Sequence, residues 1–310
     1  MPTRPRALQL RWGRWRLNLS ARTHIVGVLN VTPDSFSDGG RYARVDRALA
    51  HARRMIEAGA DVIDVGGEST RPGSSPVSLR EELRRVLPVI ERLAPRCPVP
   101  ISIDTSKAEV ARRAIEAGAA MINDVTALRG DPAMAGIAAA ARVPVVLMHM
   151  RGAPLTMQRA PRYRSLMQDL VRFFRGRMAA ATAAGIERSR LILDPGLGFG
   201  KTLNHNLEIL RRLEELAVLD RPILIGPSRK GFIGRLLDLP VAQRLEGTSA
   251  AVTAAILGGA HLVRVHDVEA MTRVARVADA IRRGRLVLRG SVAVPGGRAK
   301  ATSALYGRRG

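Results

Sequence analysis

Eight short apolar runs alternate along the chain with segments of helical periodicity, and polar or charged residues close the runs. The runs cover residues 24–30, 62–70, 100–104, 120–124, 143–149, 191–194, 222–230 and 262–266. Short apolar runs that alternate with helical patterns indicate βαβ units and a parallel sheet. Eight such units are what a (β/α)8 barrel, or TIM barrel, requires. We therefore predict this α/β fold, with the chemistry at the C-terminal ends of the strands.

Helical patterns follow the runs at regular intervals. They cover residues 44–58, 79–93, 107–117, 132–141, 163–184, 203–216, 241–257 and 268–283. Pro88 lies inside the second pattern and predicts a kink or a break, because proline lacks the N–H that a helix interior uses. Gly59 and Gly118 each follow a Glu-Ala pair at the end of a helix. Glycine suits a left-handed helix C-terminus, and its recurrence supports a barrel of equivalent units.

The two ends of the chain lie outside this repeating pattern. Residues 1–23 alternate apolar and polar, which predicts a β-hairpin with Trp12 and Trp15 on one apolar face. We expect this hairpin to pack on the N-terminal mouth of a barrel domain that spans residues 24–288. Residues 289–310 are rich in Gly, Arg, Ala and Ser without periodicity, which predicts a flexible basic tail.

The composition favours a cytoplasmic enzyme over a membrane or secreted protein. The chain has 310 residues, 46% of them hydrophobic, which suits one large barrel domain. No apolar stretch approaches membrane-spanning length, the N-terminus lacks the apolar core of a secretory signal, and Cys97 is the only cysteine.

The net charge of +23 raises the possibility of nucleic-acid binding. Arginine is spread over nearly every predicted helix, however, and aromatic residues make up only 3% of the chain, so bases would find no stacking platform. We therefore predict no specific nucleic-acid partner, although weak attraction to polyanions is expected.

Lysine is rare in this chain. Of the 50 basic residues 46 are Arg, and the four lysines are Lys107, Lys201, Lys230 and Lys300. The first three lie at predicted strand ends or in the loops that follow. Where arginine is the default cation, a retained lysine indicates a position that needs a compact ammonium group.

Polar side chains at the predicted strand ends are the candidates for chemistry. The set comprises Asn30, Asp104, Asn123, Asp194, Lys230, Arg264 and His266. A single Asp or Asn at a strand end often only caps the next helix. Seven such residues that open into one barrel mouth indicate a functional site. The other histidines lack the spacing of a metal site, and a structural role is favoured for each.

The glycine-rich segment 194–202 has the composition of a phosphate-binding loop but neither of the two common nucleotide motifs. The Walker spacing needs Gly at position 195, where Pro stands, and the dinucleotide pattern needs Gly at 201, where Lys stands. An Asp-Pro-Gly turn explains the backbone but leaves the carboxylate of Asp194 and the ammonium of Lys201 without a role.

Eight segments resemble, in order, those of the dihydropteroate synthase family of pterin-binding barrels. They are residues 27–40, 66–73, 103–107, 122–125, 148–152, 193–201, 228–230 and 264–268. The resemblance extends over about residues 24–270 and touches every predicted strand end. Two departures are slight: Gly231 stands where Ser is frequent in the family, and residues 126–128 replace a common Ser-Gly pair.

The resemblance implies condensation of (7,8-dihydropterin-6-yl)methyl diphosphate with 4-aminobenzoate, which gives 7,8-dihydropteroate and diphosphate in folate biosynthesis. It also implies Mg2+ as a cofactor and a homodimer. The electron-rich ring stabilises the positive methylene once diphosphate leaves, so no protein nucleophile is required and no Ser-His or Cys-His arrangement is expected. Catalysis would then depend on stabilising the leaving group and on positioning.

The resemblance further implies a role for each pterin ligand. Asp194 would accept hydrogen bonds from the donor edge of the ring, while Asn123 and Asp104 would bind other ring nitrogens. Lys230 would donate to the ring carbonyl and N5.

Other residues would hold the diphosphate, the metal ion and the arylamine. Arg71, Arg264 and His266 would bind the diphosphate, and Asn30 would be a ligand of Mg2+. Two loops, 31–40 and 70–78, would close over the site and form the arylamine pocket from Asp34, Phe36, Arg71 and Pro72. Catalysis is assigned to Lys230, Arg264, His266 and Asp34. Substrate binding is assigned to Thr70, Arg71, Pro72, Asp104, Asn123, Asp194, Phe199, Lys201, Ser228, Lys230, Arg264 and His266.

Three alternatives remain open from the sequence. A methyltransferase on the same barrel would use methyltetrahydrofolate and a corrinoid, but the diphosphate-binding set argues against it. An inactive synthase paralogue is disfavoured because every expected site residue is present. A basic nucleic-acid-binding protein is supported only by net charge and the tail.

Overall fold

The computed structural model describes residues 8–32, 41–69, 73–152 and 156–284. Some of the predictions fall outside these ranges. They are the basic tail, residues 289–310, and the loop residues Asp34, Phe36, Thr70, Arg71 and Pro72.

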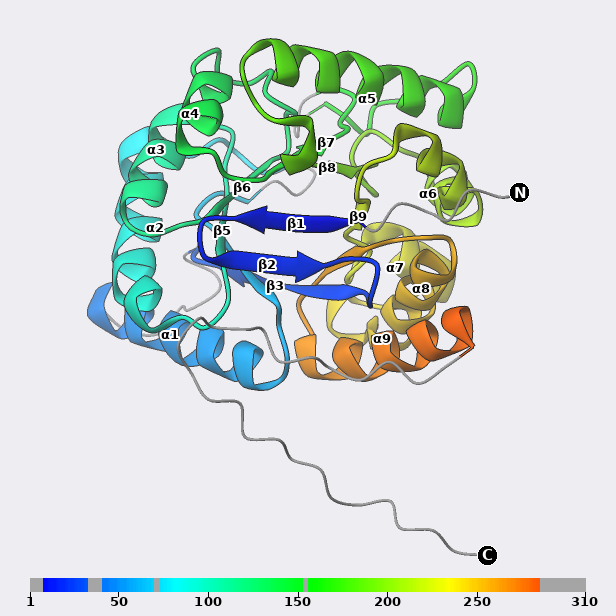
Figure 1. The fold of residues 1–310 in the computed structure, drawn as a ribbon. Coiled ribbons are helices and arrows are strands. Elements are labelled where there is room, and N and C mark those ends of the chain that lie inside the picture. The colour runs from blue at the N-terminus through cyan, green and yellow to red at the C-terminus, as the bar shows by residue number, and fades with distance from the viewer. Residues whose placement is uncertain (1–7, 33–40, 70–72, 153–155, 285–310) are drawn as a thin grey trace, which may run out of the picture.

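Eight parallel strands form the predicted barrel (Figure 1). They are β3 (His24–Asn30), β4 (Val62–Gly66), β5 (Ile101–Asp104), β6 (Met121–Asp124), β7 (Val145–Met148), β8 (Leu191–Asp194), β9 (Leu224–Ile225) and β10 (Leu262–Val265). They pair in the order β8-β7-β6-β5-β4-β3-β10-β9. A parallel bridge between Leu193 and Ile223 joins the two outer strands, and the Leu193 N–H donates to the Pro222 carbonyl at 2.9 Å. This bridge closes the sheet into a barrel.

Helices surround the barrel in a ring (Figure 1). They are α1 (Arg41–Glu57), α2 (Leu79–Leu93), α3 (Ala108–Glu116), α4 (Met134–Ala141), α5 (Leu166–Ala183), α6 (Leu203–Arg211), α7 (Gly231–Leu237), α8 (Leu245–Leu257) and α9 (Val268–Arg283). Short 3-10 helices cover Ala94–Arg96, Arg188–Arg190, Leu213–Leu219 and Val241–Gln243. None of the helices within the described residues has the length and apolar character needed to cross a membrane.

Two features of the helices differ from the sequence-based predictions. Helix α2 continues through Pro88, so the break considered there does not occur. Val86, Val89 and Ile90 are buried around it, and this packing outweighs the one missing backbone hydrogen bond. Helix α7 was not predicted, because two glycines among seven residues give a weak helical signal.

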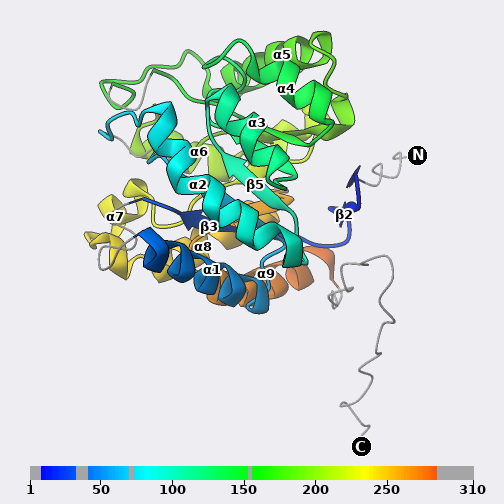
Figure 2. The same cartoon turned by 90° about the vertical axis from the view of Figure 1, so that its left-hand side faces the viewer.

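The N-terminal hairpin covers the N-terminal mouth of the barrel, as predicted. Strands β1 (Gln9–Trp12) and β2 (Trp15–Asn18) pair antiparallel, with Trp12 opposite Trp15. The hairpin crosses the centre of the helix ring in Figure 1 and lies on the opposite side of the barrel from α7 in Figure 2. Its Leu10, Trp12, Leu17 and the following Leu19 pack against Val26, Val62, Met121, Val146, Ile192, Leu224 and Leu262. The Trp12 indole N–H also donates to the Ala120 carbonyl at 2.6 Å.

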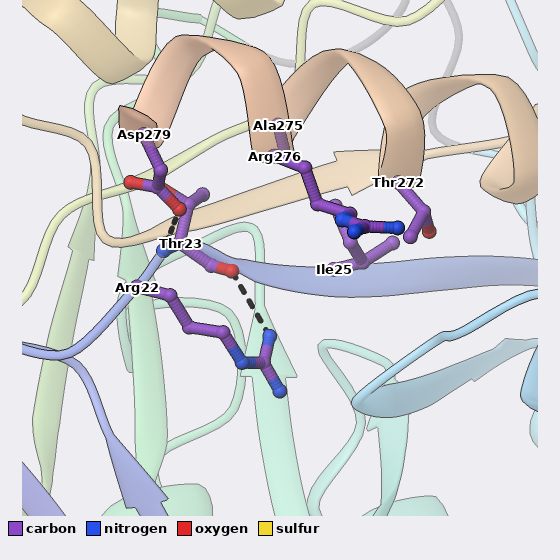
Figure 3. A pocket seen from close by; sticks show the side chains of 7 residues that line it. All are labelled: Arg22, Thr23, Ile25, Thr272, Ala275, Arg276 and Asp279. Atoms are coloured by element: carbon purple, nitrogen blue, oxygen red, sulfur yellow. Dashed lines mark hydrogen bonds between the residues drawn. The ribbon is translucent and has the colours of Figure 1, made fainter. Parts of the chain in front are cut away.

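A polar network fixes the start of β3 near the same end of the barrel (Figure 3). The Thr23 N–H donates to the Asp279 carboxylate at 2.7 Å, and Arg22 donates to the Thr23 carbonyl at 3.1 Å and to Asp61 at 2.7 Å. Burial opposes ionisation of Asp61, but the hydrogen bonds and charges of Arg22 and His24 together outweigh it and hold the pKa of Asp61 well below its usual range. The cavity beside this network measures about 20 Å³, which is room for one water molecule and not for a substrate.

We predict that Asp61→Ala destabilises the fold by about 3–5 kcal/mol, because it leaves the part-buried Arg22 guanidinium and the Ile25 N–H without their acceptor. Asp61 has a lowered pKa when folded, so its stabilising contribution is present at neutral pH and is lost as the pH falls. Urea unfolding measures the change. The matched control Glu269→Ala breaks an exposed ion pair with Arg273 and should cost no more than about 1 kcal/mol. Equal losses in the two variants would contradict the assignment.

Candidate active site

The strand register brings the predicted site residues to one level of the barrel. Across neighbouring strands, Asn30 is the register partner of Gly66, and Asp104 is the partner of both Gly66 and Asn123. Farther round the sheet, Asp194 ends β8 opposite Met148. Because all strands are parallel, these positions meet at the C-terminal mouth, where barrel enzymes carry their chemistry.

Arg264 connects two buried carboxylates inside this mouth. Its Nε donates to Asp64 Oδ2 at 2.6 Å, and its Nη2 donates to Asp104 Oδ2 at 2.7 Å. The Asn123 amide donates to the same Asp64 oxygen at 2.9 Å. Asp64, Asp104 and Asn123 are all buried. One network thus orients side chains from β4, β5, β6 and β10.

Asp104 holds a proton more readily than an ordinary aspartate. Burial is the main cause, and it raises the pKa of Asp104 to about 7, with the carboxylates of Asp64, Glu82 and Asp124 acting in the same direction and Arg264 opposing them. The Asp104 Oδ1 atom is buried and has no hydrogen-bond partner within the described part of the chain. It is therefore an acceptor that a ligand can use.

Asp194 lies buried at the end of β8, beside two of the lysines. The Gly196 N–H donates to its Oδ1 at 2.7 Å. Burial raises the pKa of Asp194, while that N–H group and the nearby cations Lys230, Lys201 and Arg264 act against the increase. The Lys230 ammonium lies 4.2 Å from the centre of the Phe199 ring. A carboxylate at the end of β8 and an ammonium in the segment after β9 thus lie at the mouth.

Lys201 is placed differently from the other predicted substrate ligands. Its side chain is fully buried, and its ammonium donates to His149 Nδ1 at 2.9 Å, to the His149 carbonyl at 3.3 Å and to the Phe199 carbonyl at 3.0 Å. An ammonium has three hydrogens, and each has an acceptor inside the protein.

Ser228 and His266 meet beyond the ends of β9 and β10. Ser228 Oγ lies 3.0 Å from His266 Nδ1 and accepts the His266 backbone N–H at 3.2 Å. The expectation that no Ser-His arrangement would form is therefore corrected. The two residues are 38 positions apart in the sequence, and only the pairing of β9 with β10 brings them together.

Arg229, between Ser228 and Lys230, stabilises the turn after β9 through its contacts with Thr248 and Asp267. It adopts a left-handed conformation with a φ of 58°, its N–H donates to Thr248 Oγ1 at 3.0 Å, and its guanidinium pairs with Asp267, with Nε donating at 2.9 Å. These bonds hold the strained turn that presents its two neighbours.

Sequence reasoning missed Asp64. The predicted site residues close the apolar runs, whereas Asp64 lies inside its run, between Ile63 and Val65. A carboxylate within a fully buried strand requires a partner, and that requirement is the signal that could have identified it.

The third strand-end lysine, Lys107, holds the segment that follows β4. Its ammonium pairs with Glu68 and, at 2.6 Å, with the fully buried Glu82 of α2. Arg85 also donates to the Gly67 carbonyl at 2.7 Å. The described residues immediately before Thr70 are thus tied to α2.

Asn30 was predicted to be a ligand of Mg2+. Within the described residues, no group of three or more His, Cys, Asp or Glu side chains could hold a metal ion. An amide oxygen at the mouth is a hard donor of the type that Mg2+ accepts, and this ion usually completes its shell with phosphate oxygens and water. Asn30 therefore fits a Mg2+ ion that it would hold jointly with a bound diphosphate.

Comparison with known proteins identifies the family. The model of the family described as pterin binding enzyme matches residues 26–266. A dihydropteroate synthase of Synechocystis is 47% identical over 271 residues, which cover 87% of this chain and 91% of that protein. The chain belongs to the dihydropteroate synthase family. The enzyme of Escherichia coli K12 is 49% identical over 257 residues, which cover 83% of this chain and 91% of the other.

Solved structures of this family share the fold. The Yersinia pestis dihydropteroate synthase in complex with a sulfonamide drug superposes with a TM-score of 0.84 at 48% identity, covering 89% of this chain and 99% of that one. The Xanthomonas albilineans synthase in complex with 7,8-dihydropteroate gives a TM-score of 0.79 at 46% identity, covering 87% and 97%. The chain is accordingly a transferase of folate synthesis, as the resemblance implied.

We predict that Asp104→Asn stabilises the protein at pH 8, because it removes one of two carboxylates that share Arg264. The folded pKa of about 7 is above the unfolded value, so the native state binds the extra proton and the contribution of Asp104 to stability falls as the pH rises from about 4 to 7. The variant should gain about 1–2 kcal/mol at pH 8 and less at pH 5. Thermal unfolding at both pH values measures this difference, with the exposed Glu269→Gln as control. A loss of stability at pH 8 would contradict the prediction.

Proposed function

We propose that the barrel mouth condenses (7,8-dihydropterin-6-yl)methyl diphosphate with 4-aminobenzoate to give 7,8-dihydropteroate and diphosphate. The observation that carries the proposal is a cluster of buried polar side chains, Asp104, Asn123 and Asp194, beside Lys230 and Arg264. A pterin has a hydrogen-bond donor edge together with a carbonyl and ring nitrogens, and this cluster offers a partner for each. The test is diphosphate release by the purified protein when both substrates and Mg2+ are supplied.

Pterin recognition follows from the chemistry of the three side chains. Asp194 has one oxygen bound to the Gly196 N–H and accepts from the donor edge of the ring. Asp104 has an unused buried oxygen for a ring N–H, and Asn123 offers an amide whose orientation Asp64 fixes. Lys230 donates to the ring carbonyl and N5, and the Phe199 ring beneath its ammonium limits where that ammonium can lie.

Cations around the mouth bind the leaving group. Arg264 and His266 lie on and just after β10, and the Ser228 hydroxyl orients the His266 ring. Asn30 would hold Mg2+ with the diphosphate, and this ion would neutralise charge on the leaving oxygens. Arg71 adds a further cation in this proposal. Stabilising the leaving diphosphate lowers the barrier directly, because charge develops there as the bond breaks.

The reaction breaks the bond between the methylene carbon and the diphosphate oxygen and forms a bond from that carbon to the arylamine nitrogen. The ring nitrogens stabilise the positive methylene between these steps. The amine nitrogen loses its proton after attack. The Ser228–His266 pair is not required as a nucleophile on this route, since the barrel has only to hold the ring and accept the leaving charge. Asp34, Phe36, Thr70 and Pro72, on the two long loops, complete the arylamine pocket in the proposal.

We also propose that the chain acts in the cytoplasm as a homodimer. Leu236, Leu237, Val241 and Leu245 expose 38–51% of their surface within ten residues of sequence, around the end of α7 and the start of α8. Several exposed apolar side chains so close together in the sequence suit a two-fold interface between copies. Sedimentation at micromolar concentration tests the dimer, and Leu237→Glu should yield monomers.

We predict that Asp194→Ala weakens binding of pteroate by about 2–5 kcal/mol, because it leaves the donor edge of the ring without a charged acceptor in a dry pocket. Calorimetry measures this loss. The fold should remain, as shown by a cooperative thermal transition, because the carboxylate lies at the mouth and, among the described residues, accepts a hydrogen bond only from the Gly196 N–H. Near-normal pteroate affinity in the folded variant would remove Asp194 from the proposed role.

We predict an order of binding that charge imposes. Asn30 can complete a Mg2+ shell only when phosphate oxygens are present, and Arg71 then has an anion to bind. Closure of the two loops, and with it the arylamine pocket, should follow the anion. Calorimetry should show 4-aminobenzoate binding poorly to the free protein and more tightly once pterin, diphosphate and Mg2+ are added. Equal affinity in both states would mean that the arylamine site is preformed.

A further inference from the structure

Lys201 is the one ammonium among the described lysines that has no exposed surface. Its three hydrogens go to one ring nitrogen and two backbone carbonyls, all from His149 and Phe199. His149 follows β7, whereas Phe199 lies in the segment after β8. The side chain therefore joins the ends of two neighbouring strands from inside the protein.

The segment 195–200 lies so close to the chain after β7 that it depends on glycine at two points. A Cβ on Gly196 would lie 2.2 Å from the His149 carbonyl oxygen, and a Cβ on Gly200 would lie 2.3 Å from the Arg151 carbonyl oxygen. Both glycines also have positive φ, at 68° and 65°. The His149 carbonyl at this contact is also an acceptor of the buried Lys201 ammonium.

Two elements of the pterin pocket depend on the same segment. The Gly196 N–H that binds Asp194 is at its start, and the Phe199 ring beneath Lys230 is at its end. The carbonyl of Phe199 is itself an acceptor of Lys201. Displacement of Lys201 would thus move the N–H from Asp194 and the ring from Lys230.

We propose that Lys201 is a positioning residue: its buried ammonium holds the segment 195–200 against the end of β7 and so sets Asp194 and Phe199 for pterin binding, without touching the substrate. The inference rests on the proposed function and refines the earlier assignment of Lys201 as a direct ligand. It also explains why lysine stands here in a chain that otherwise prefers arginine, since an enclosed site with three converging acceptors suits a compact ammonium.

The charge of Lys201 adds to its geometric role. The charged groups that face Asp194 are Lys230, Lys201 and Arg264, and all three favour its ionised form. Burial lowers the pKa of Lys201 to about 7, with Lys230 acting in the same direction and Asp194 opposing. His149, the other titratable neighbour, stays neutral because burial and Lys201 lower its pKa to about 2. Lys201 is therefore charged at pH 6 and largely neutral at pH 8.5.

The test compares Lys201→Met with the wild type by calorimetry, with pteroate and pyrophosphate as separate probes. Pteroate affinity should fall at least tenfold, whereas pyrophosphate affinity should stay within twofold, because the anion is held by groups on other strands. The loss for pteroate should be larger at pH 6 than at pH 8.5, since only the charged lysine helps Asp194 to ionise. Asp104 titrates in both the variant and the wild type, so its effect cancels when their pteroate affinities are compared at the same pH.

The matched control is Thr202→Ala. It removes the N-terminal cap of α6, where Thr202 Oγ1 accepts the His205 N–H at 3.2 Å, one residue from Lys201 and without a change of charge. It should lower the melting temperature and leave pteroate affinity unchanged at both pH values. If Lys201→Met does not fold, Lys201→Gln, which keeps amide donors for the two carbonyls but loses the positive charge, should show a smaller loss of affinity that is still confined to pteroate.

Three results would overturn the inference. They are a folded variant with wild-type pteroate affinity, an equal loss for pteroate and pyrophosphate, or a loss that does not depend on pH. A wild-type protein that binds no pteroate would instead overturn the proposed function, so the two failures are distinguishable.

Discussion

Arg264 reaches across the inside of the barrel from β10 to Asp64 on β4 and Asp104 on β5, past the strand β3 that lies between them. Two buried carboxylates share this one guanidinium, so the group carries a net negative charge whenever Asp104 is ionised. With Asp194 nearby, the mouth gathers several buried acceptors, and one of them, Asp104 Oδ1, has no hydrogen-bond partner within the described residues. Such a pocket is unfavourable when empty and becomes favourable when a ligand supplies N–H groups, which is the character expected of a pterin site.

The sequence was sufficient to predict the architecture because the barrel repeats one simple unit. The bounds of β3 and β8, and of helices α2 and α9, agree with the predicted ranges. The apolar spacing of these elements, and Gly284 directly after α9, define them clearly. Elements whose stability comes from tertiary packing were harder. Helix α7 has a weak local signal and forms because Phe232 and Ile233 are buried.

The candidate site was predictable to the extent that its residues end strands. Asp104 and Asp194 meet that rule, and the register brings Asp104 level with Asn123 without further information. Contacts between side chains on opposite sides of the barrel have no such local sequence signal. The pair of Asp64 with Arg264 spans 200 residues of sequence, and the Ser228–His266 contact depends on which strands are neighbours. Predicting these contacts requires the closed barrel.

The departure from the family pattern at residues 126–128 has a physical explanation in the structure. Ala127 and Leu128, in the segment that replaces a Ser-Gly pair, adopt left-handed conformations with φ of 54° and 61°. Asp124 compensates by accepting the Leu128 N–H at 2.7 Å, and Arg177 donates to the Ala127 carbonyl at 2.8 Å. The strained turn after β6 is thus held by a carboxylate and a guanidinium, and Asn123 keeps its place in the mouth.

The N-terminal end of the barrel stabilises the fold, whereas the C-terminal end carries the candidate active site. At the N-terminal end, Trp12 and its neighbours fill the mouth, and Asp61 is fully paired with cationic and backbone donors. At the C-terminal end, glycine contacts, left-handed turns and crowded carboxylates all oppose stability. The first end makes the second possible, because strained turns persist only where the surrounding structure fixes them. Lys201 belongs to this balance: a buried ammonium is costly by itself, but here it satisfies the carbonyls that the close loop contact would otherwise leave unpaired.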